Sequence, residues 1–222
     1  MSQSSLSRVL QPIATETDFT RSVDREIIRQ IGELNRRGVQ VLRQALLEDQ
    51  PALPAMVSEL RESWLGLSEV AEARVAEAPY LLFDLQLGEL DPAVLTATAG
   101  LDPTNTAAPT SWLGQPRGRA YVRLLSHFSW QVCRGRPIAA TLLLGLSAET
   151  ALRLRDLDLA AVDSIADQPG DHLALRWSTD RWFWGRRLEA AGRGDMRSLW
   201  QTTLAGVQRL AALARPETQP PT

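Results

Sequence analysis

The stretch RPIAATLLLGLSAETALRLRDLD, residues 136–158, predicts one helix, a sharp turn and a second helix. Gly145 stands where the turn needs a left-handed residue, and Ser147 is placed to cap the second helix. The apolar residues expected to pack between the two helices are Ile138, Leu142, Leu146, Ala151 and Leu154. This pattern is typical of a helix-turn-helix that docks in a DNA groove, and equally of two helices packed in a core. The sequence leaves both interpretations open.

If the second helix enters a groove, its outward polar side chains would contact the nucleic acid. Arg153 could reach a guanine edge or a phosphate, and Thr150 could reach a phosphate or a thymine methyl group. Neighbouring arginines and two from a later basic segment would add contacts to the DNA backbone. The candidate DNA-contacting residues are Thr150, Arg153, Arg155, Arg134, Arg136, Arg186 and Arg187.

That later segment, RWSTDRWFWGRRLEAAGRGDMR, residues 176–197, interleaves arginines with aromatic side chains. Such a mixture suits phosphate contacts or stacking on bases. Tryptophans in a small protein more often anchor a core or a protein interface, and we favour the interface interpretation. The candidate partner-interface residues are Trp177, Trp182, Phe183 and Trp184.

The composition is that of an ordinary soluble globular protein. Of the 222 residues, 44% are hydrophobic and 23% are charged, and no apolar run approaches the ~20 residues that cross a bilayer. The N-terminus lacks the charged start and apolar stretch of a signal peptide. Cys133 is the only cysteine, which excludes an intrachain disulfide and a site built from several thiolates. We therefore expect a cytoplasmic protein without membrane contact, metal or cofactor.

The charge is distributed unevenly along the chain. All 24 basic residues are arginine, and the formal net charge is −2. Residues 1–110 carry 9 arginines and 16 acidic residues, whereas residues 111–222 carry 15 arginines and 10 acidic residues. Such asymmetry suggests that one half faces a polyanion or an acidic partner.

Hydrophobic spacing predicts a mainly α fold. Amphipathic helices are expected at 24–47, 55–65, 118–134 and 195–214, with short helices from Ser68 and at 159–167. Alternating residues near 80–86 and 172–178 predict short extended segments.

We expect two weakly repeated helical domains, each ending in a short extended segment, and a C-terminal amphipathic helix. The expected boundaries are a disordered tail at 1–22, an acidic helical domain at 23–90, a linker at 91–116, a basic helical domain with the helix-turn-helix-like element at 117–190, the C-terminal helix at 191–215 and a tail at 216–222.

The repeat rests on a gapless alignment of the two halves. A shift of 92 residues places Leu60 on Leu152, and it places Val70 on Val162. Both halves then share a long helix, shorter helices and a final extended segment. A chance match of leucines in a leucine-rich chain is the alternative.

No catalytic constellation is evident. His127 and Cys133 are six residues apart on one expected helix, so their side chains face different ways. We expect that the protein is not an enzyme.

The pattern resembles the FlhD subunit of the bacterial flagellar master regulator. The pattern consists of a long helix, a turn with the sequence LG[LI], and a second helix that has an N-terminal capping residue and acidic residues. A further short helix follows, and then a final segment in which the residue types alternate. In the second half it is the segment LLLGLSAETALRLRDLDLAAVDSIADQPGDHLALRW, and in the first half it runs from IGELNRRGVQVLRQALLED to LSEVAEARVAEAPYLLFDLQL. The likeness is one of pattern and covers roughly 27–90 and 118–178. It extends to FlhD-like subunits in regulators of integrative conjugative elements.

The resemblance implies a helical regulator subunit that works with an FlhC-like partner, which carries a cysteine zinc cluster, on double-stranded promoter DNA. The chain departs from the family in length and in holding two copies of the pattern. FlhD dimerises, so a fused duplicate would form an internal pseudo-dimer, with a homodimer as the alternative. A second functional hypothesis is a helical adaptor or scaffold of a secretion or conjugation apparatus, without a nucleic-acid role.

Overall fold

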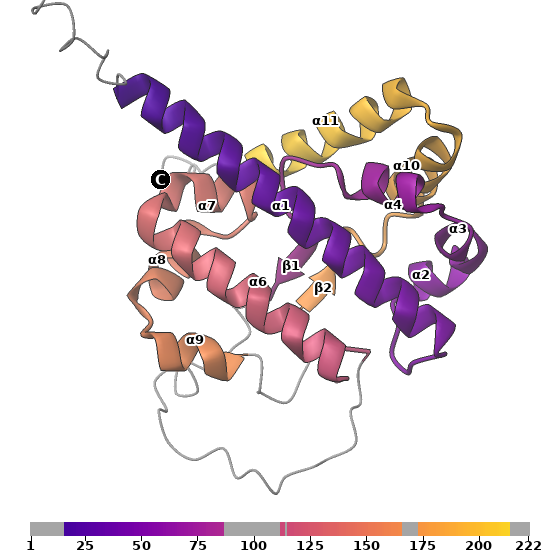
Figure 1. Ribbon diagram of the computed structural model, residues 1–222, viewed down its shortest axis with the longest axis horizontal. Helices are drawn as coiled ribbons and strands as arrows, with labels where there is room; N and C mark the ends of the chain where they lie inside the picture. Colours follow the sequence, from indigo (N-terminus) through magenta and orange to yellow (C-terminus); the bar gives the residue numbers. More distant parts are fainter. Residues whose placement is uncertain (1–15, 87–111, 114, 166–172, 214–222) are drawn as a thin grey trace, which may run out of the picture.

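The computed structural model describes residues 16–86, 112–113, 115–165 and 173–213 (Figure 1). The protein is mainly α-helical, as predicted, with one small sheet among these residues. The elements of the first half are α1 (Glu16–Leu47), α2 (Ala55–Glu59), α3 (Arg61–Leu65), α4 (Glu69–Ala76) and β1 (Phe83–Leu85). Those of the second half are α6 (Pro116–Gly135), α7 (Pro137–Leu143), α8 (Ala148–Asp156), α9 (Leu159–Ile165) and β2 (Leu173–Leu175). The chain continues with α10 (Arg181–Arg193) and α11 (Met196–Leu213).

Helix α1 buries the apolar stripe that predicted it, which includes Ile31, Leu34 and Leu42. It begins at Glu16, within the segment expected to be a disordered tail. No glycine or proline lies between Glu16 and the expected start at Asp24, so the helix can continue through this segment at one added hydrogen bond per residue.

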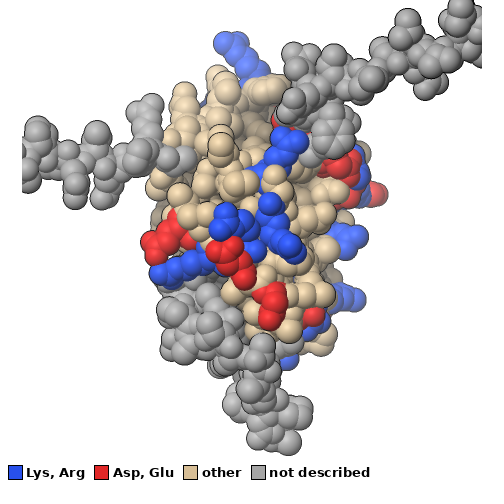
Figure 2. Space-filling view, turned by 90° about the vertical axis from the view of Figure 1, so that its left-hand side faces the viewer, with Lys and Arg blue, Asp and Glu red and all other residues tan. Residues whose placement is uncertain are grey.

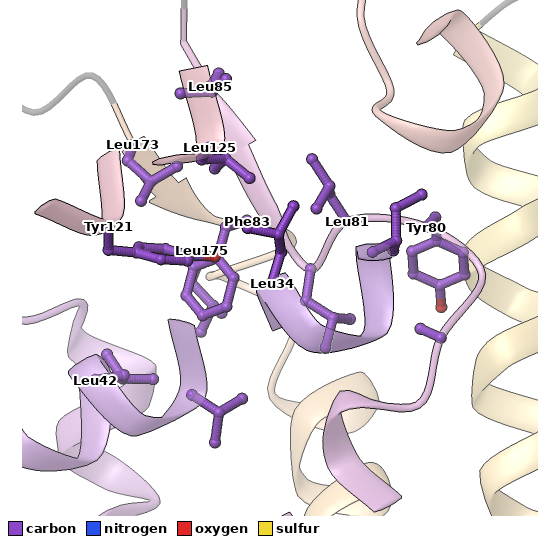
Figure 3. Packing of buried hydrophobic residues seen from close by; sticks show 14 of the residues in the cluster. Leu34, Leu42, Tyr80, Leu81, Phe83, Leu85, Tyr121, Leu125, Leu173 and Leu175 are labelled. Atoms are coloured by element: carbon purple, nitrogen blue, oxygen red, sulfur yellow. The ribbon is translucent and has the colours of Figure 1, made fainter. Parts of the chain in front are cut away.

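Gly38 interrupts the stripe of α1 because two aromatic side chains approach the helix there. A Cβ atom at this position would overlap the ring of Phe83 and the hydroxyl of Tyr121. These two rings meet edge to face with their centroids 5.5 Å apart, and Figure 3 shows them beside Leu175. Gly38 therefore lets α1, β1 and α6 meet at the centre of the core.

The two predicted extended segments pair with each other. Strands β1 and β2 are antiparallel, with Phe83 opposite Leu175, Asp84 opposite Ala174 and Leu85 opposite Leu173. A shift of 90 residues places β1 on β2. The pair Phe83–Leu175 then corresponds to the pair Leu173–Leu85, which is also present in the sheet. This is the contact of a two-fold axis that passes between Asp84 and Ala174.

The helices follow the same two-fold relation. Helix α1 packs on α3 and α4, α6 packs on α8 and α9, and α1 and α6 pack on each other. Ser68 caps α4 by accepting a hydrogen bond from the Ala71 amide, and Asp158, 90 residues later, accepts one from the Ala161 amide at the start of α9. The two strands and these two caps are thus related by a shift of 90 residues, where the sequence alignment used a shift of 92.

The two halves do not have separate cores. One cluster of buried hydrophobic residues includes side chains from both halves and from the α10–α11 pair. The last part of the expected linker also belongs to it, because Trp112 and Leu113 are buried and α6 begins at Pro116. Residues 91–111 lie outside the described part of the chain. The expected boundary at 190/191 falls inside α10, which packs on α3 and α4.

Candidate nucleic-acid and partner interfaces

The turn between α7 and α8 has the two local features that the sequence predicted. Gly145 has a φ of 64°, and the Ser147 hydroxyl accepts a hydrogen bond from the Thr150 amide at 3.0 Å. Both predictions are therefore confirmed. Leu146, Ala151 and Leu154 are buried as expected. The predictions for Ile138 and Leu142 are wrong: their exposed fractions are 77% and 43%, because the seven-residue α7 turns Ala140 inward instead.

Arg176 fixes this turn to the central strands. Its guanidinium donates to the carbonyl oxygens of Leu144 and Leu81 at 2.7 and 3.0 Å, and it reaches a carboxylate oxygen of Asp84 at 3.1 Å. Burial lowers the pKa of Arg176, while the Asp84 carboxylate opposes that change. One buried side chain thus joins β1, β2 and the α7–α8 turn.

The outward arginines of α8 are exposed, and each pairs with a carboxylate of the same helix. A guanidinium nitrogen of Arg153 lies 2.6 Å from a Glu149 oxygen, and one of Arg155 lies 2.8 Å from an Asp156 oxygen. Thr150 is half-buried, and its hydroxyl lies 2.8 Å from that of Ser147. The outer surface of α8 is therefore balanced in charge.

The other predicted arginines near α7 lie at the junction with α6. Arg134 is exposed and stacks 4.8 Å from the centre of the Trp130 ring. Arg136 lies 3.6 Å from Asp24 of α1, at a groove of about 780 Å³ between α1 and α6. Figure 2 shows basic and acidic side chains interleaved on the side where α7, α8 and α9 lie in Figure 1. This face presents arginines without forming an unbroken basic patch.

Arg186 and Arg187 are neighbours with opposite environments. Arg186 is exposed, whereas Arg187 is completely buried. The Arg187 guanidinium donates to the carbonyl oxygens of Val75 and Glu77, both at 2.9 Å, and to two threonine hydroxyls of α11. The assignment of Arg187 to DNA contact is wrong, because its donors are used inside the protein.

Most of the predicted aromatic interface is also internal. Phe183 and Trp184 are fully buried, and the Trp184 indole donates to the Arg176 carbonyl oxygen at 2.9 Å. Trp177 is partly buried and packs on Phe183, with ring centroids 4.6 Å apart. The assignments of Phe183 and Trp184 are wrong, because their side chains pack α10 against the core. The assignment of Trp177, which is partly exposed, stays a prediction. Trp182 is 58% exposed and remains available to a partner.

The structure shows an exposed apolar face that the sequence analysis did not identify. Leu199 and Leu210 of α11 are buried, whereas Met196 and Val207 of the same helix are exposed. Together with Trp200 and Leu204 they form a second apolar face on α11. The missed signal was composition, because α11 has no acidic residue and is apolar on both sides.

The described residues give no support to a catalytic or metal centre. His127 lies 2.8 Å from an Asp163 oxygen, and Cys133 is buried elsewhere on α6. Burial raises the pKa of the Cys133 thiol to about 11, which makes it a poor nucleophile. Within the described ranges, no cluster of side chains could hold a metal ion, and no helix has the length and apolar character to span a membrane.

Comparison with known proteins adds no relative. No protein-family model, no curated protein and no solved structure matches the chain.

Proposed function

We propose that the chain is a subunit of a cytoplasmic, DNA-binding transcriptional regulator of the FlhD-like kind, acting with an FlhC-like partner. The observation that carries this proposal is the α7–α8 element. Gly145 and Ser147 shape its turn, and Arg153 and Arg155 point outward from its second helix. The similar packing of α1 on α3 and α4 and of α6 on α8 and α9 supports the same proposal, since a fused duplicate would supply from one chain what two FlhD subunits supply.

The partner is part of the proposal because of the charge on α8. Glu149 and Asp156 hold the two outward arginines, so the chain alone has little net positive charge on this helix. Affinity for DNA depends mainly on cations that neutralise phosphates. We expect the partner to supply the additional cations and to position α8 in a groove.

The test is a DNA-binding titration with the partner that co-purifies from the native host. Fluorescence anisotropy of a labelled duplex is measured for the chain alone and for the complex over a range of salt concentrations. The complex is expected to bind more tightly than the chain alone, with an affinity that falls as salt rises. Replacing Arg153 and Arg155 together with alanine should lower the slope of log affinity against log salt by about 2.

The matched control is Arg193→Ala on α10, since Arg193 is also exposed and also pairs with a glutamate four residues away. It should leave the slope unchanged. An unchanged slope for the α8 variant, with its circular dichroism spectrum retained, would refute the assignment of α8 to DNA contact.

The second candidate function is a protein adaptor that binds no nucleic acid. The exposed apolar face of α11 favours it, because contiguous apolar surface marks a protein contact. The absence of any duplex binding by the complex at low salt would support this function over the first.

A further inference from the structure

Helix α11 leaves a continuous apolar face uncovered. Met196, Trp200, Leu204 and Val207 recur at a spacing of three to four residues, which places them on one side of the helix. Their exposed fractions run from 42% to 63%. The opposite side of α11 packs on α7 and α10, so the exposed residues are not needed to hold the helix in place.

The size of this face is suited to another helix. From Met196 to Val207 the face extends for about 17 Å of helix, and one exposed tryptophan can bury roughly 150–250 Å² in an interface. Single exposed apolar side chains are ordinary, whereas a row of four along one side of a helix marks a recognition surface. Anchors at this spacing are those of a helix laid against a helix or groove.

The charges beside the face indicate the partner. Arg186 and Arg197 flank its N-terminal part and, within the described residues, neither forms an ion pair with a carboxylate. Arg186 donates to Ser198 and Gln201 and lies 6.0 Å from the centre of the Trp182 ring. Its charge helps to lower the pKa of Asp195, but the two side chains do not form an ion pair. By contrast, Arg181, Arg193 and Arg209 of the same helix pair all bond to carboxylates.

A second copy of the chain that docks through its own α11 does not satisfy these arginines. Helix α11 carries no acidic residue, so two α11 faces in contact would bring together only cations. The nearest carboxylates are engaged, because Glu189 pairs with Arg193 and Asp195 accepts a hydrogen bond from the Ser198 amide. The partner must therefore provide the acidic groups.

We infer that the α11 face binds an amphipathic helix of another protein, with apolar anchors on Trp200 and Leu204 and acidic side chains opposite Arg186 and Arg197. The inference rests on the proposed function in one respect: it assigns this amphipathic helix to the FlhC-like partner subunit. It uses a different surface from α8, so the two proposals fail separately.

The experiment uses the full chain and a fluorescent synthetic peptide. The peptide has leucines at i, i+3, i+4 and i+7, glutamates beside them and a length of about 18 residues, with a matched peptide that has lysine for glutamate. Anisotropy is expected to give an affinity at least about tenfold higher for the glutamate peptide. Leu204→Glu should lower that affinity about tenfold or more, because it removes an anchor and adds a repelling charge.

Two further variants separate charge from folding. Arg186→Ala with Arg197→Ala should lower the affinity for the glutamate peptide about three- to tenfold and remove most of its salt dependence. Val70→Glu, on an equally exposed apolar residue of α4, should leave the affinity unchanged. Circular dichroism confirms that each variant is folded.

Three results would overturn the inference. The first is equal binding of the two peptides, or no binding of the glutamate peptide. The second is a wild-type chain that has the mass of a dimer in solution while the Leu204→Glu variant has the mass of a monomer. A second copy of the chain would then be the occupant of the α11 face. The third is binding of vesicles of anionic lipid that Leu204→Glu abolishes, which would make a membrane surface the occupant.

Discussion

Arg187 acts in the fold through four hydrogen bonds and no carboxylate. It holds the C-terminal end of α4 against α11, because Val75 belongs to the last turn of α4, Glu77 follows that helix, and the two threonine acceptors are on α11. Replacing Arg187 with methionine should lower the free energy of unfolding by about 2–4 kcal/mol, since buried carbonyl and hydroxyl groups lose their partner. Urea denaturation measures this change. Arg186→Met, at the exposed neighbour, should alter stability by less than about 0.5 kcal/mol, and equal losses for both variants would contradict the hydrogen-bond assignment.

The contrast between Arg187 and Ser147 shows what the sequence could predict for single residues. A cap or a left-handed turn depends on the next few residues, so Ser147 and Gly145 were recognisable in the local pattern. Burial of Arg187 or Trp184 depends on carbonyls and rings more than a hundred residues away in the chain. From its arginines and tryptophans, the segment at 176–197 was predicted to lie at the surface, whereas Trp184 and Arg187 of this segment are buried.

At the scale of elements, the α7–α8 turn depends on the absence of a side chain at Gly145. A Cβ atom there would overlap the Arg176 guanidinium and lie 2.8 Å from a Leu210 methyl group, in a backbone conformation that favours glycine. Gly145→Ala should therefore destabilise the protein by about 2–3 kcal/mol. Thermal unfolding checks the value. Gly192→Ala is the control, because Gly192 lies within α10 with open space around it, and the added methyl should stabilise the helix by about 0.5–1 kcal/mol.

The helices themselves were predictable, but the faces that they bury were not always so. Helix α1 has apolar residues on one side only, and the structure buries that side. Helix α11 has apolar residues on two sides, so periodicity could not determine whether Leu199 or Trp200 faces inward. Its packing against α7 and α10 decides the question and leaves the second face as the candidate partner surface.

At the scale of the whole molecule, the uneven charge along the sequence is partly used within the chain. Within the described ranges, ion pairs that join arginines after residue 110 to acidic residues before it include Arg136–Asp24, Arg176–Asp84 and Arg181–Glu59. The asymmetry suggested a polyanion outside the chain. These ion pairs show that part of the positive charge of the second half is neutralised by acidic residues of the first half. Arg186 and Arg197, which form no ion pair within the described residues and lie beside the apolar face of α11, are the arginines that we assign to a partner.

A shared core also predicts that the two halves unfold together. Cys133 reports on the second half: it is buried, and its raised pKa of about 11 leaves roughly one thiolate in a thousand at pH 8. Leu42→Ala in α1 removes a buried side chain of the first half and should cost about 2–5 kcal/mol. If the core is continuous, this variant lowers the urea concentration at which Cys133 becomes reactive to a thiol reagent, and it lowers the midpoint by circular dichroism equally. Val70→Ala, at an exposed position, should move neither midpoint. If Leu42→Ala left the urea midpoint of Cys133 reactivity unchanged, or if circular dichroism showed two transitions, the halves would be independent domains despite the pairing of β1 with β2.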